Sequence, residues 1–181
     1  MKKFLKIIGI LILIIVLFRG IIYRLAINYR TIGIRTEIEI TNKELIKLIE
    51  TKSKDREVDF KEILKIADEI TIEELKFTID RASNNPNELI NTKKANCIGY
   101  SAMYNSITNY LIKQNRLQDK IEARHKIGQL DLFGINLHQF FENSFFKDHD
   151  FNEIENKETG QIILIDPSIS DYLYIKRVSK N

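Results

Sequence analysis

The feature that most constrains this chain is an apolar run at its start. Ile7–Phe18 is twelve consecutive residues without a charged or polar side chain, and three lysines precede it. Residues 4–28 are mostly apolar, and as a helix rising about 1.5 Å per residue they would extend roughly 37 Å, enough to cross a bilayer core of about 30 Å. Such a segment predicts either a membrane anchor or a secretory signal.

The residues after the apolar run favour the anchor. Only Gly20 and Ala26 are small there, and they do not form the pair of small residues typical of a signal cleavage site. We therefore expect residues 1–30 to be a membrane anchor and residues 31–181 to be one folded domain; the protein is secreted if the segment is cleaved. The short lysine-bearing tail is the easier end to keep in the cytoplasm, which places the body outside it.

The charge distribution argues against nucleic acid as a partner. The first 30 residues contain six basic and no acidic side chains, and because the whole chain carries +3, residues 31–181 carry a net charge of −3. A nucleic-acid-binding domain shows its excess of Lys and Arg on the folded part. The chain also lacks the glycine-rich phosphate-binding motifs G-x-x-x-x-G-K-[ST] and G-x-G-x-x-G.

The body divides into helices followed by strands. Apolar and polar side chains alternate over residues 31–40, which predicts a half-buried strand. Thr41 to Glu44 form a capping box that predicts a short helix to about Glu50. Residues 58–81 predict two helices, with a break at a second capping box that starts at Thr71. We expect further strands over 121–130, 150–155, 161–165 and 172–178, with a hairpin turn at 156–160. Helices first and antiparallel strands later predict the α+β class.

Cys97 is the only cysteine, and it lies at a predicted helix start. Asn96 is a favourable N-cap for a long helix with an apolar stripe that includes Tyr100, Met103 and Tyr104. The backbone N–H groups and dipole of a helix N-terminus favour a thiolate over a thiol, and a nearby imidazole favours it further. The same residue also fits an inert core position, because free cysteines are usually buried.

Three histidines are candidates for the partner base. His125 lies in a predicted strand and His138 in a segment without clear periodicity, whereas His149 begins a strand that turns back into Gln161–Ile165. That hairpin can bring His149 near Asp166, whose carboxylate would orient the imidazole. Asp166 is also well placed to start a turn before Pro167, so a purely structural role stays open.

At these residues the sequence resembles the transglutaminase-like superfamily of papain-fold cysteine enzymes, in its bacterial form. The family has a C-x-G-Y-[AS] motif at a helix start, an H-x-W-N-E-V strand and an apolar strand that ends in D-P-[TS]. Here these motifs correspond to Cys97–Ser101, His149–Ile154 and Asp166–Ser168, in the family order and over roughly residues 90–170. Phe151 stands where the family usually has Trp, and the segment before His149 is long and contains His138.

The resemblance implies a papain-like fold with a Cys97, His149 and Asp166 triad, no cofactor, no metal and a peptide or protein substrate. Cys97 would attack an amide carbonyl to form a thioester, with His149 as the base and Asp166 as its orienting partner. The backbone N–H of Cys97 is the natural first oxyanion donor, and Asn96 or an upstream side chain could supply the second. Because many bacterial members are hydrolases, hydrolysis is favoured over cross-linking.

Two other functions compete with this one. The domain could be a catalytically silent, membrane-tethered binding or assembly module, since a fold does not fix a function. A metal site at Asp148, His149 and Asp150 has admissible ligands. However, consecutive strand residues point to alternate faces, so the three cannot reach one ion together.

Overall fold

The computed structural model describes residues 2–143 and 146–178 of the 181-residue chain, so Met1 of the expected anchor and residues 179–181 of the expected body lie outside the described residues. The helices are α1 (Lys2–Ala26), α2 (Lys43–Ser53), α3 (Phe60–Glu74), α4 (Pro86–Thr92), α5 (Cys97–Gln114), the 3₁₀ helix η1 (Leu137–Phe140) and α6 (Pro167–Leu173). The strands are β1 (Ile27–Ile34), β2 (Lys76–Phe77), β3 (Lys94–Ala95), β4 (Ile121–Leu132), β5 (Ile135–Asn136), β6 (His149–Asn156) and β7 (Gln161–Ile165).

An antiparallel sheet is the centre of the body. Its strands lie in the order β1-β4-β6-β7, and β5 pairs with the end of β4. The registers place Gly128 of β4 opposite His149, and Asn152 of β6 opposite Ile165. The tip of the β6–β7 hairpin is the expected turn, where the Asn156 side chain accepts backbone hydrogen bonds and Gly160 takes a φ of 70°. Helices pack on this sheet, which is the arrangement expected of an α+β protein.

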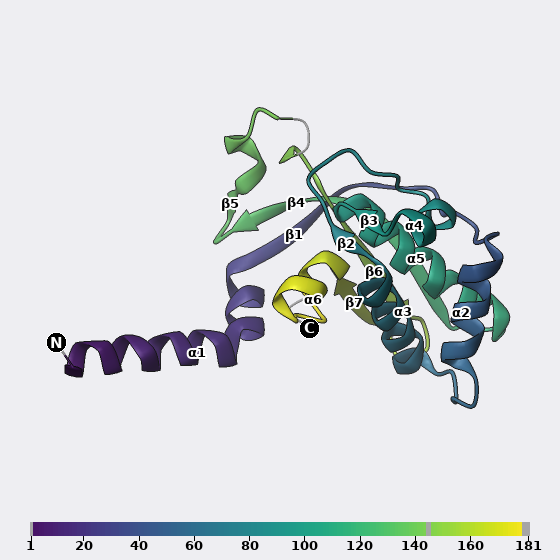
Figure 1. Ribbon diagram of the computed structural model, residues 1–181, viewed down its shortest axis with the longest axis horizontal. Helices are drawn as coiled ribbons and strands as arrows, with labels where there is room; N and C mark the ends of the chain where they lie inside the picture. Colours follow the sequence, from purple (N-terminus) through teal and green to yellow (C-terminus); the bar gives the residue numbers. More distant parts are fainter. Residues whose placement is uncertain (1, 144–145, 179–181) are drawn as a thin grey trace.

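Helix α5 connects the sheet to the other helices (Figure 1). It packs along β4 and β6 on one side and against α3, α4 and α6 on the others, and its Tyr100, Met103 and Tyr104 are fully buried. These side chains meet Ile154 and Ile163 of the sheet in one apolar core. The core therefore fixes the start of α5 relative to the ends of β6 and β7, where the candidate residues lie.

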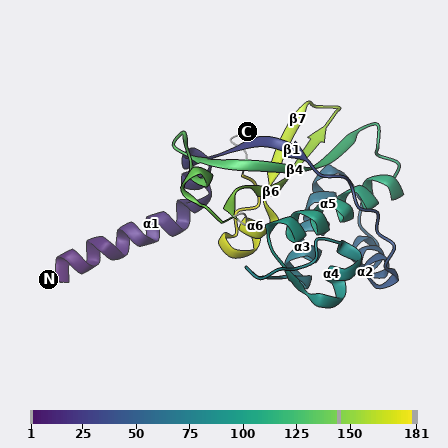
Figure 2. The same cartoon turned by 90° about the horizontal axis from the view of Figure 1, so that it is seen from above.

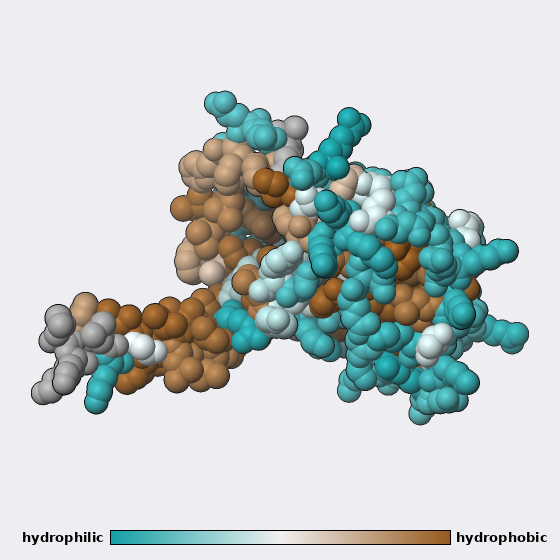
Figure 3. Space-filling model, in the orientation of Figure 1, coloured by the Kyte–Doolittle hydropathy of each residue, from teal (hydrophilic) through white to brown (hydrophobic). Residues whose placement is uncertain are grey.

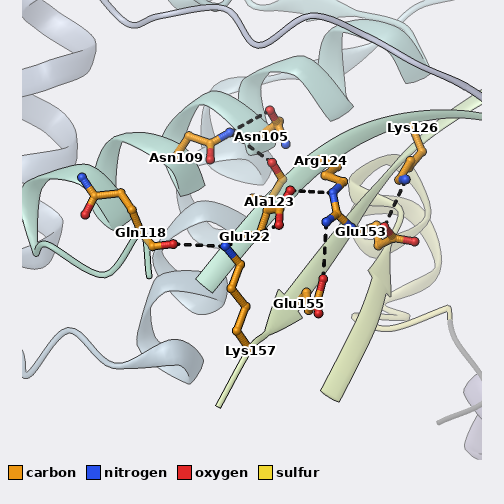
Figure 4. Close-up of polar contacts among 10 residues, drawn as sticks. All are labelled: Asn105, Asn109, Gln118, Glu122, Ala123, Arg124, Lys126, Glu153, Glu155 and Lys157. Carbon is orange, nitrogen blue, oxygen red and sulfur yellow. Dashed lines mark hydrogen bonds and ion pairs between the residues drawn. The ribbon is translucent and has the colours of Figure 1, made fainter. Parts of the chain in front are cut away.

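Ion pairs between β4 and β6 stabilise a second part of the sheet (Figure 4). Arg124 lies between Glu153, with Nη1 at 3.0 Å from Oε1, and Glu155, with Nη2 at 3.4 Å from Oε2. Lys126 Nζ is 3.1 Å from the same Glu153 oxygen. Opposite charges on neighbouring strands favour this register, which places His149 at the start of β6 beside Gly128.

Helix α1 extends away from the body as an apolar rod (Figures 2 and 3). Its segment Lys6–Ala26 is long and apolar enough to cross a membrane and is not buried by the rest of the protein, although a signal sequence at this position would have the same properties. The helix ends at Ala26, and residues 27 and 28, which the expected anchor of residues 4–28 included, begin β1.

Several expected element boundaries were wrong. The first strand covers Ile27–Ile34 and not 31–40, with a register shift between Thr31 and Gly33 that leaves Ile32 and Ile34 exposed. The first short helix is capped by Asn42 and not Thr41, and it continues to Ser53.

The structure lacks one expected helix break and one expected strand. Residues 60–74 form a single helix, because Thr71 faces the core on an uninterrupted apolar stripe and caps nothing. Residues 172–178 are not a strand: Tyr172 and Leu173 end α6, and the chain that follows makes a backbone hydrogen bond from Val178 to Leu164 without forming a ladder.

Candidate active site

Cys97 is the first residue of α5, as the sequence predicted. The Asn96 side chain accepts hydrogen bonds from the backbone N–H groups of Ile98 and Gly99 at 3.1 and 3.2 Å, which confirms the expected N-cap. Cys97 is 8% exposed and lies at the positive end of an 18-residue helix. The dipole of such a helix stabilises negative charge on the sulfur.

The first turn of α5 packs closely on the chain before it. A Cβ on Gly99 would lie 2.8 Å from the Ala95 Cβ and 3.1 Å from the Ser83 carbonyl oxygen. Real Cβ atoms do not approach so closely, so any other residue would push the helix start away from this segment. Gly99 therefore helps to fix the position of Cys97.

His149 lies between Cys97 and Asp166. Its Nε2 is 2.5 Å from Oδ2 of Asp166, and its ring lines the same cavity as Cys97, close enough for the cysteine to influence its charge. Because Nε2 faces the carboxylate, Nδ1 is the ring nitrogen left for the sulfur. Burial opposes the charged imidazolium, but the Asp166 charge, the Asp166 hydrogen bond and the nearby Cys97 outweigh it and raise the pKa of His149 well above its usual value.

Asp166 ends β7 and caps α6. It is fully buried, and its Oδ1 accepts hydrogen bonds from the Ser168 hydroxyl at 2.6 Å and from the backbone N–H groups of Ser168 and Ile169. Burial raises the pKa of this carboxyl. The charge and hydrogen bond of His149, together with the hydrogen bonds of Ser168 and Tyr29, lower it below the ordinary value. The structural role as a cap and the contact with His149 thus use different oxygens of one carboxylate.

Tyr29 is a site residue that sequence reasoning missed. Its hydroxyl lies 2.8 Å from Asp166 Oδ2 and donates to it, and it is 2.7 Å from the hydroxyl of Tyr23 on α1. Its ring packs edge-on against Phe151, with the ring centres 5.0 Å apart, and against His149 at 6.1 Å. No local pattern marks Tyr29, because it lies 137 residues before Asp166 and within the segment interpreted as the anchor.

A cavity of about 380 Å³ opens beside Cys97 and His149. Its walls are mostly apolar and include Phe77, Leu137 and Phe141. Volumes of this size hold small ligands or the side chains of a larger one. The geometry can therefore place an apolar group next to the sulfur atom.

The other two histidines have different surroundings. His138 lies in η1 and lines the same cavity, where Nδ1 is 2.8 Å from the Phe146 carbonyl oxygen and the buried Nε2 has no hydrogen-bond partner among the described residues. His125 lies in β4 with Nε2 at 2.7 Å from Oδ2 of Asp150. Of the three histidines, the structure therefore brings His149 to the cysteine.

The residues considered as metal ligands do not converge. Asp148 faces the cavity, while Asp150 is fully buried and pairs with Arg35 and His125. Burial raises the pKa of Asp150, but the hydrogen bonds and charges of these two partners lower it below its usual value. Among residues 2–143 and 146–178, no group of three or more His, Cys, Asp or Glu side chains could hold a metal ion.

The chain was compared with protein-family models, curated proteins and solved structures, and none of them matched.

Proposed function

We propose that this protein is a cysteine acyl-transfer enzyme that cleaves an amide bond through a thioester. The observation that carries the proposal is the line of contacts from Cys97 at a helix start through His149 to Asp166, beside an apolar cavity. The order of the three motifs supports membership of the transglutaminase-like superfamily, with its papain-like arrangement of a cysteine-bearing helix on an antiparallel sheet. We further propose that α1 anchors the protein in a membrane, with the body on the extracytoplasmic side.

The mechanism follows from the protonation states that these contacts favour. The raised pKa of His149 favours an imidazolium beside Asp166. We propose that Cys97 reacts as the thiolate that pairs with this imidazolium. The thiolate attacks the amide carbonyl and forms a C–S bond, and the backbone N–H of Cys97 is a donor for the developing oxyanion. His149 then gives its proton to the nitrogen as the C–N bond breaks, and the amine leaves.

Water completes the cycle in a hydrolase. His149, now neutral, takes a proton from water, whose oxygen attacks the thioester carbonyl, and the acid leaves as Cys97 regains its starting state. Asp166 holds the imidazole in one orientation throughout, because its other oxygen is fixed by the cap of α6. The apolar cavity supports a substrate with an apolar group next to the scissile carbonyl.

The first test is the pH dependence of Cys97 alkylation by iodoacetamide in the detergent-solubilised full chain. Cys97 is the only cysteine, so the mass of the intact protein reports its modification directly. We expect alkylation already at about pH 6, and we expect His149→Ala to remove this reactivity. His138→Ala is the matched control, because His138 lines the same cavity without contacting Asp166 in the described structure.

Two results would contradict the proposal. One is a thiol that reacts only above about pH 8.5, the ordinary value for a free cysteine. The other is a reactivity that neither histidine substitution changes. Either would make a catalytically silent binding or assembly module the leading interpretation.

A second measurement separates hydrolysis from cross-linking. Peptide amides with an apolar side chain are incubated with the enzyme in the presence of a fluorescent primary amine. Hydrolysis gives the free acid, whereas transamidation incorporates the amine into the peptide. We expect the free acid, and Cys97→Ser is the control for both products.

A further inference from the structure

Exposed apolar side chains gather on one projection of the body, beside α1 (Figure 3). We use the name apolar rim for the exposed side chains Leu132, Phe133, Ile135, Phe140 and Phe141, in and beside the β4–β5 turn and η1, together with Tyr174, which follows α6 and lies against Arg19 of α1. Phe133 is 76% and Phe140 is 67% exposed. Soluble surfaces rarely gather so many large apolar side chains, and such patches usually mark contact with another phase or partner.

The backbone of the rim also departs from what a water-exposed turn favours. Phe133 and Gly134 form the two-residue turn between β4 and β5, with φ values of 49° and 86°. Turns with two positive φ values favour Asn or Gly, and a bulky aromatic there is strained. Residues 132–141 contain no Asp, Glu, Lys or Arg. The chain thus places an aromatic residue at a strained and exposed position within an uncharged segment.

The position of the rim relative to α1 is fixed by hydrogen bonds. The backbone N–H of Phe133 donates to the carbonyl oxygen of Ala26, the last residue of α1, at 2.8 Å, and Leu132 pairs with Ile27. The β4–β5 turn therefore lies where α1 leaves the body. Figures 1 and 2 both show this turn and η1 on the side of the body from which α1 projects.

Two arginines in the last turns of α1 hold the helix to the body. Arg19 Nε donates to the Leu173 carbonyl oxygen at 2.6 Å, and its guanidinium lies 5.9 Å from the centre of the Tyr174 ring. Arg24 Nη1 donates to the Arg177 carbonyl oxygen at 3.4 Å. Arginines and tyrosines are the side chains typical of the boundary between lipid and water. No linker separates α1 from β1, so the depth of the helix in a membrane determines the depth of the rim.

We propose that the apolar rim enters the surface of the lipid bilayer that α1 spans, so that the body rests on the membrane through the β4–β5 turn, η1 and the end of α6. The proposal rests on the membrane anchoring proposed above and not on the chemistry of Cys97. The partner is the bilayer because the rim is continuous with the emerging end of an apolar helix and residues 132–141 carry no charged side chain.

The contact has a consequence for the cavity. Leu137, His138 and Phe141 line the cavity and belong to the same segment as the rim. Insertion of the rim would therefore hold one wall of the cavity against the membrane surface. Substrates presented at that surface would be favoured over those free in solution.

Tryptophan fluorescence tests the proposal, since the chain contains no tryptophan. Three single-substitution variants of the full chain are placed in vesicles of equimolar phosphatidylcholine and phosphatidylglycerol. Phe133→Trp and Phe140→Trp report on the rim. Tyr110→Trp is the control, because the Tyr110 hydroxyl contacts Glu50 on α2, at the end of the body opposite α1 (Figure 1).

We expect phosphatidylcholine brominated near the top of its acyl chains to quench both rim probes and to leave the control unchanged. We expect aqueous acrylamide to quench the control probe more strongly than either rim probe. Phe140→Trp lies outside the strained turn, so it keeps the test valid if Phe133→Trp perturbs the fold.

Three results would overturn the proposal in different ways. Rim probes quenched by acrylamide as strongly as the control would show that the rim faces water. Rim probes shielded from acrylamide but not quenched by brominated lipid would show that a second copy or another protein covers it. A chain that alkaline carbonate strips from the vesicles would refute the anchor and the rim together. None of these results depends on the reactivity of Cys97, so they stay separate from a failure of the proposed enzyme activity.

Discussion

Replacing Asp166 by Asn is the sharpest perturbation of the candidate site. The substitution keeps the shape of the side chain, and its oxygen can still accept the backbone N–H groups of Ser168 and Ile169, so the cap of α6 survives. The other carboxylate oxygen becomes an NH₂ group facing His149 Nε2. Two donors cannot share this contact, so the imidazole must present Nε2 as an acceptor and carry its proton on Nδ1, towards Cys97.

The magnitude follows from what the carboxylate does in the fold. Burial alone disfavours a charged His149, and the charge and hydrogen bond of Asp166 are the main contacts that reverse this. We therefore expect Asp166→Asn to lower the pKa of His149 to or below its ordinary value of about 6.5. Breaking a buried pair costs about 3–5 kcal/mol, and the lower end applies because the amide can still donate to the Tyr29 hydroxyl.

The stability that the contact between His149 and Asp166 contributes depends on pH. The pKa of His149 is raised in the folded protein, so its contribution to stability is complete below the unfolded value of about 6.5 and is lost as pH rises through the folded value. The loss of stability in Asp166→Asn should therefore be largest near pH 6 and smaller in alkaline solution. Urea unfolding followed by circular dichroism at several pH values measures this difference.

Carbon-13 NMR of ring-labelled histidine measures the pKa itself, and only three signals need assignment. The matched control is Asp148→Asn, which removes the same charge from the neighbouring residue at the cavity wall. We expect the control to shift the His149 titration much less than Asp166→Asn does. A His149 signal that titrates identically in wild type and Asp166→Asn would refute the coupling on which the proposed mechanism depends.

Three further substitutions test other parts of the site. Tyr29→Phe removes a hydrogen bond to a charged group, so it should destabilise the protein by about 1.5–3 kcal/mol in urea unfolding near neutral pH, and an unchanged stability would show that the carboxylate does not need this hydroxyl. Gly99→Ala should displace the start of α5, costing about 1–3 kcal/mol and slowing alkylation of the cysteine; unchanged stability would show that the contact relaxes freely. Arg35→Gln leaves the buried Asp150 carboxylate short of a charge partner and should cost about 3 kcal/mol near neutral pH. This loss should begin to shrink as the pH falls below about 4, the ordinary value of an unfolded aspartate, and should disappear only below the lowered pKa of Asp150 in the fold; a pH-independent loss would contradict it.

The parts of the site that could be predicted from sequence are those determined by interactions between residues close together in the chain. Asn96 before an apolar stripe is a capping signal within a few residues, and it places Cys97 correctly at a helix start. The turn at 156–160 between two apolar segments predicts a hairpin, and the hairpin brings His149 to Asp166. In both cases the physical cause lies within one or two elements.

The parts that could not be predicted depend on contacts distant in sequence. Residues 172–178 were expected to be a strand, yet Tyr172 and Leu173 end the short helix that Asp166 and Pro167 begin, and the following residues only run beside β7 through the hydrogen bond from Val178 to Leu164. The first strand was misplaced because its partner is the far end of β4, and the pairing runs back into residues 27–30. Alternating apolar and polar residues indicate that one face of a segment is buried. They do not indicate which other strand pairs with its backbone.

Tyr29 connects the membrane segment to the candidate active site. The contacts run from Tyr23 on α1 to Tyr29 on β1, then to Asp166 and His149. A truncated chain that begins at residue 31, where sequence reasoning placed the domain boundary, would lose the first half of β1 and the hydroxyl that supports Asp166. We expect such a chain to unfold at a lower urea concentration than a chain that begins at Ile27, even if both fold, because the buried Asp166 carboxylate loses a hydrogen-bond donor. Equal unfolding midpoints in the two would show that the body holds its carboxylate without help from the residues next to the membrane.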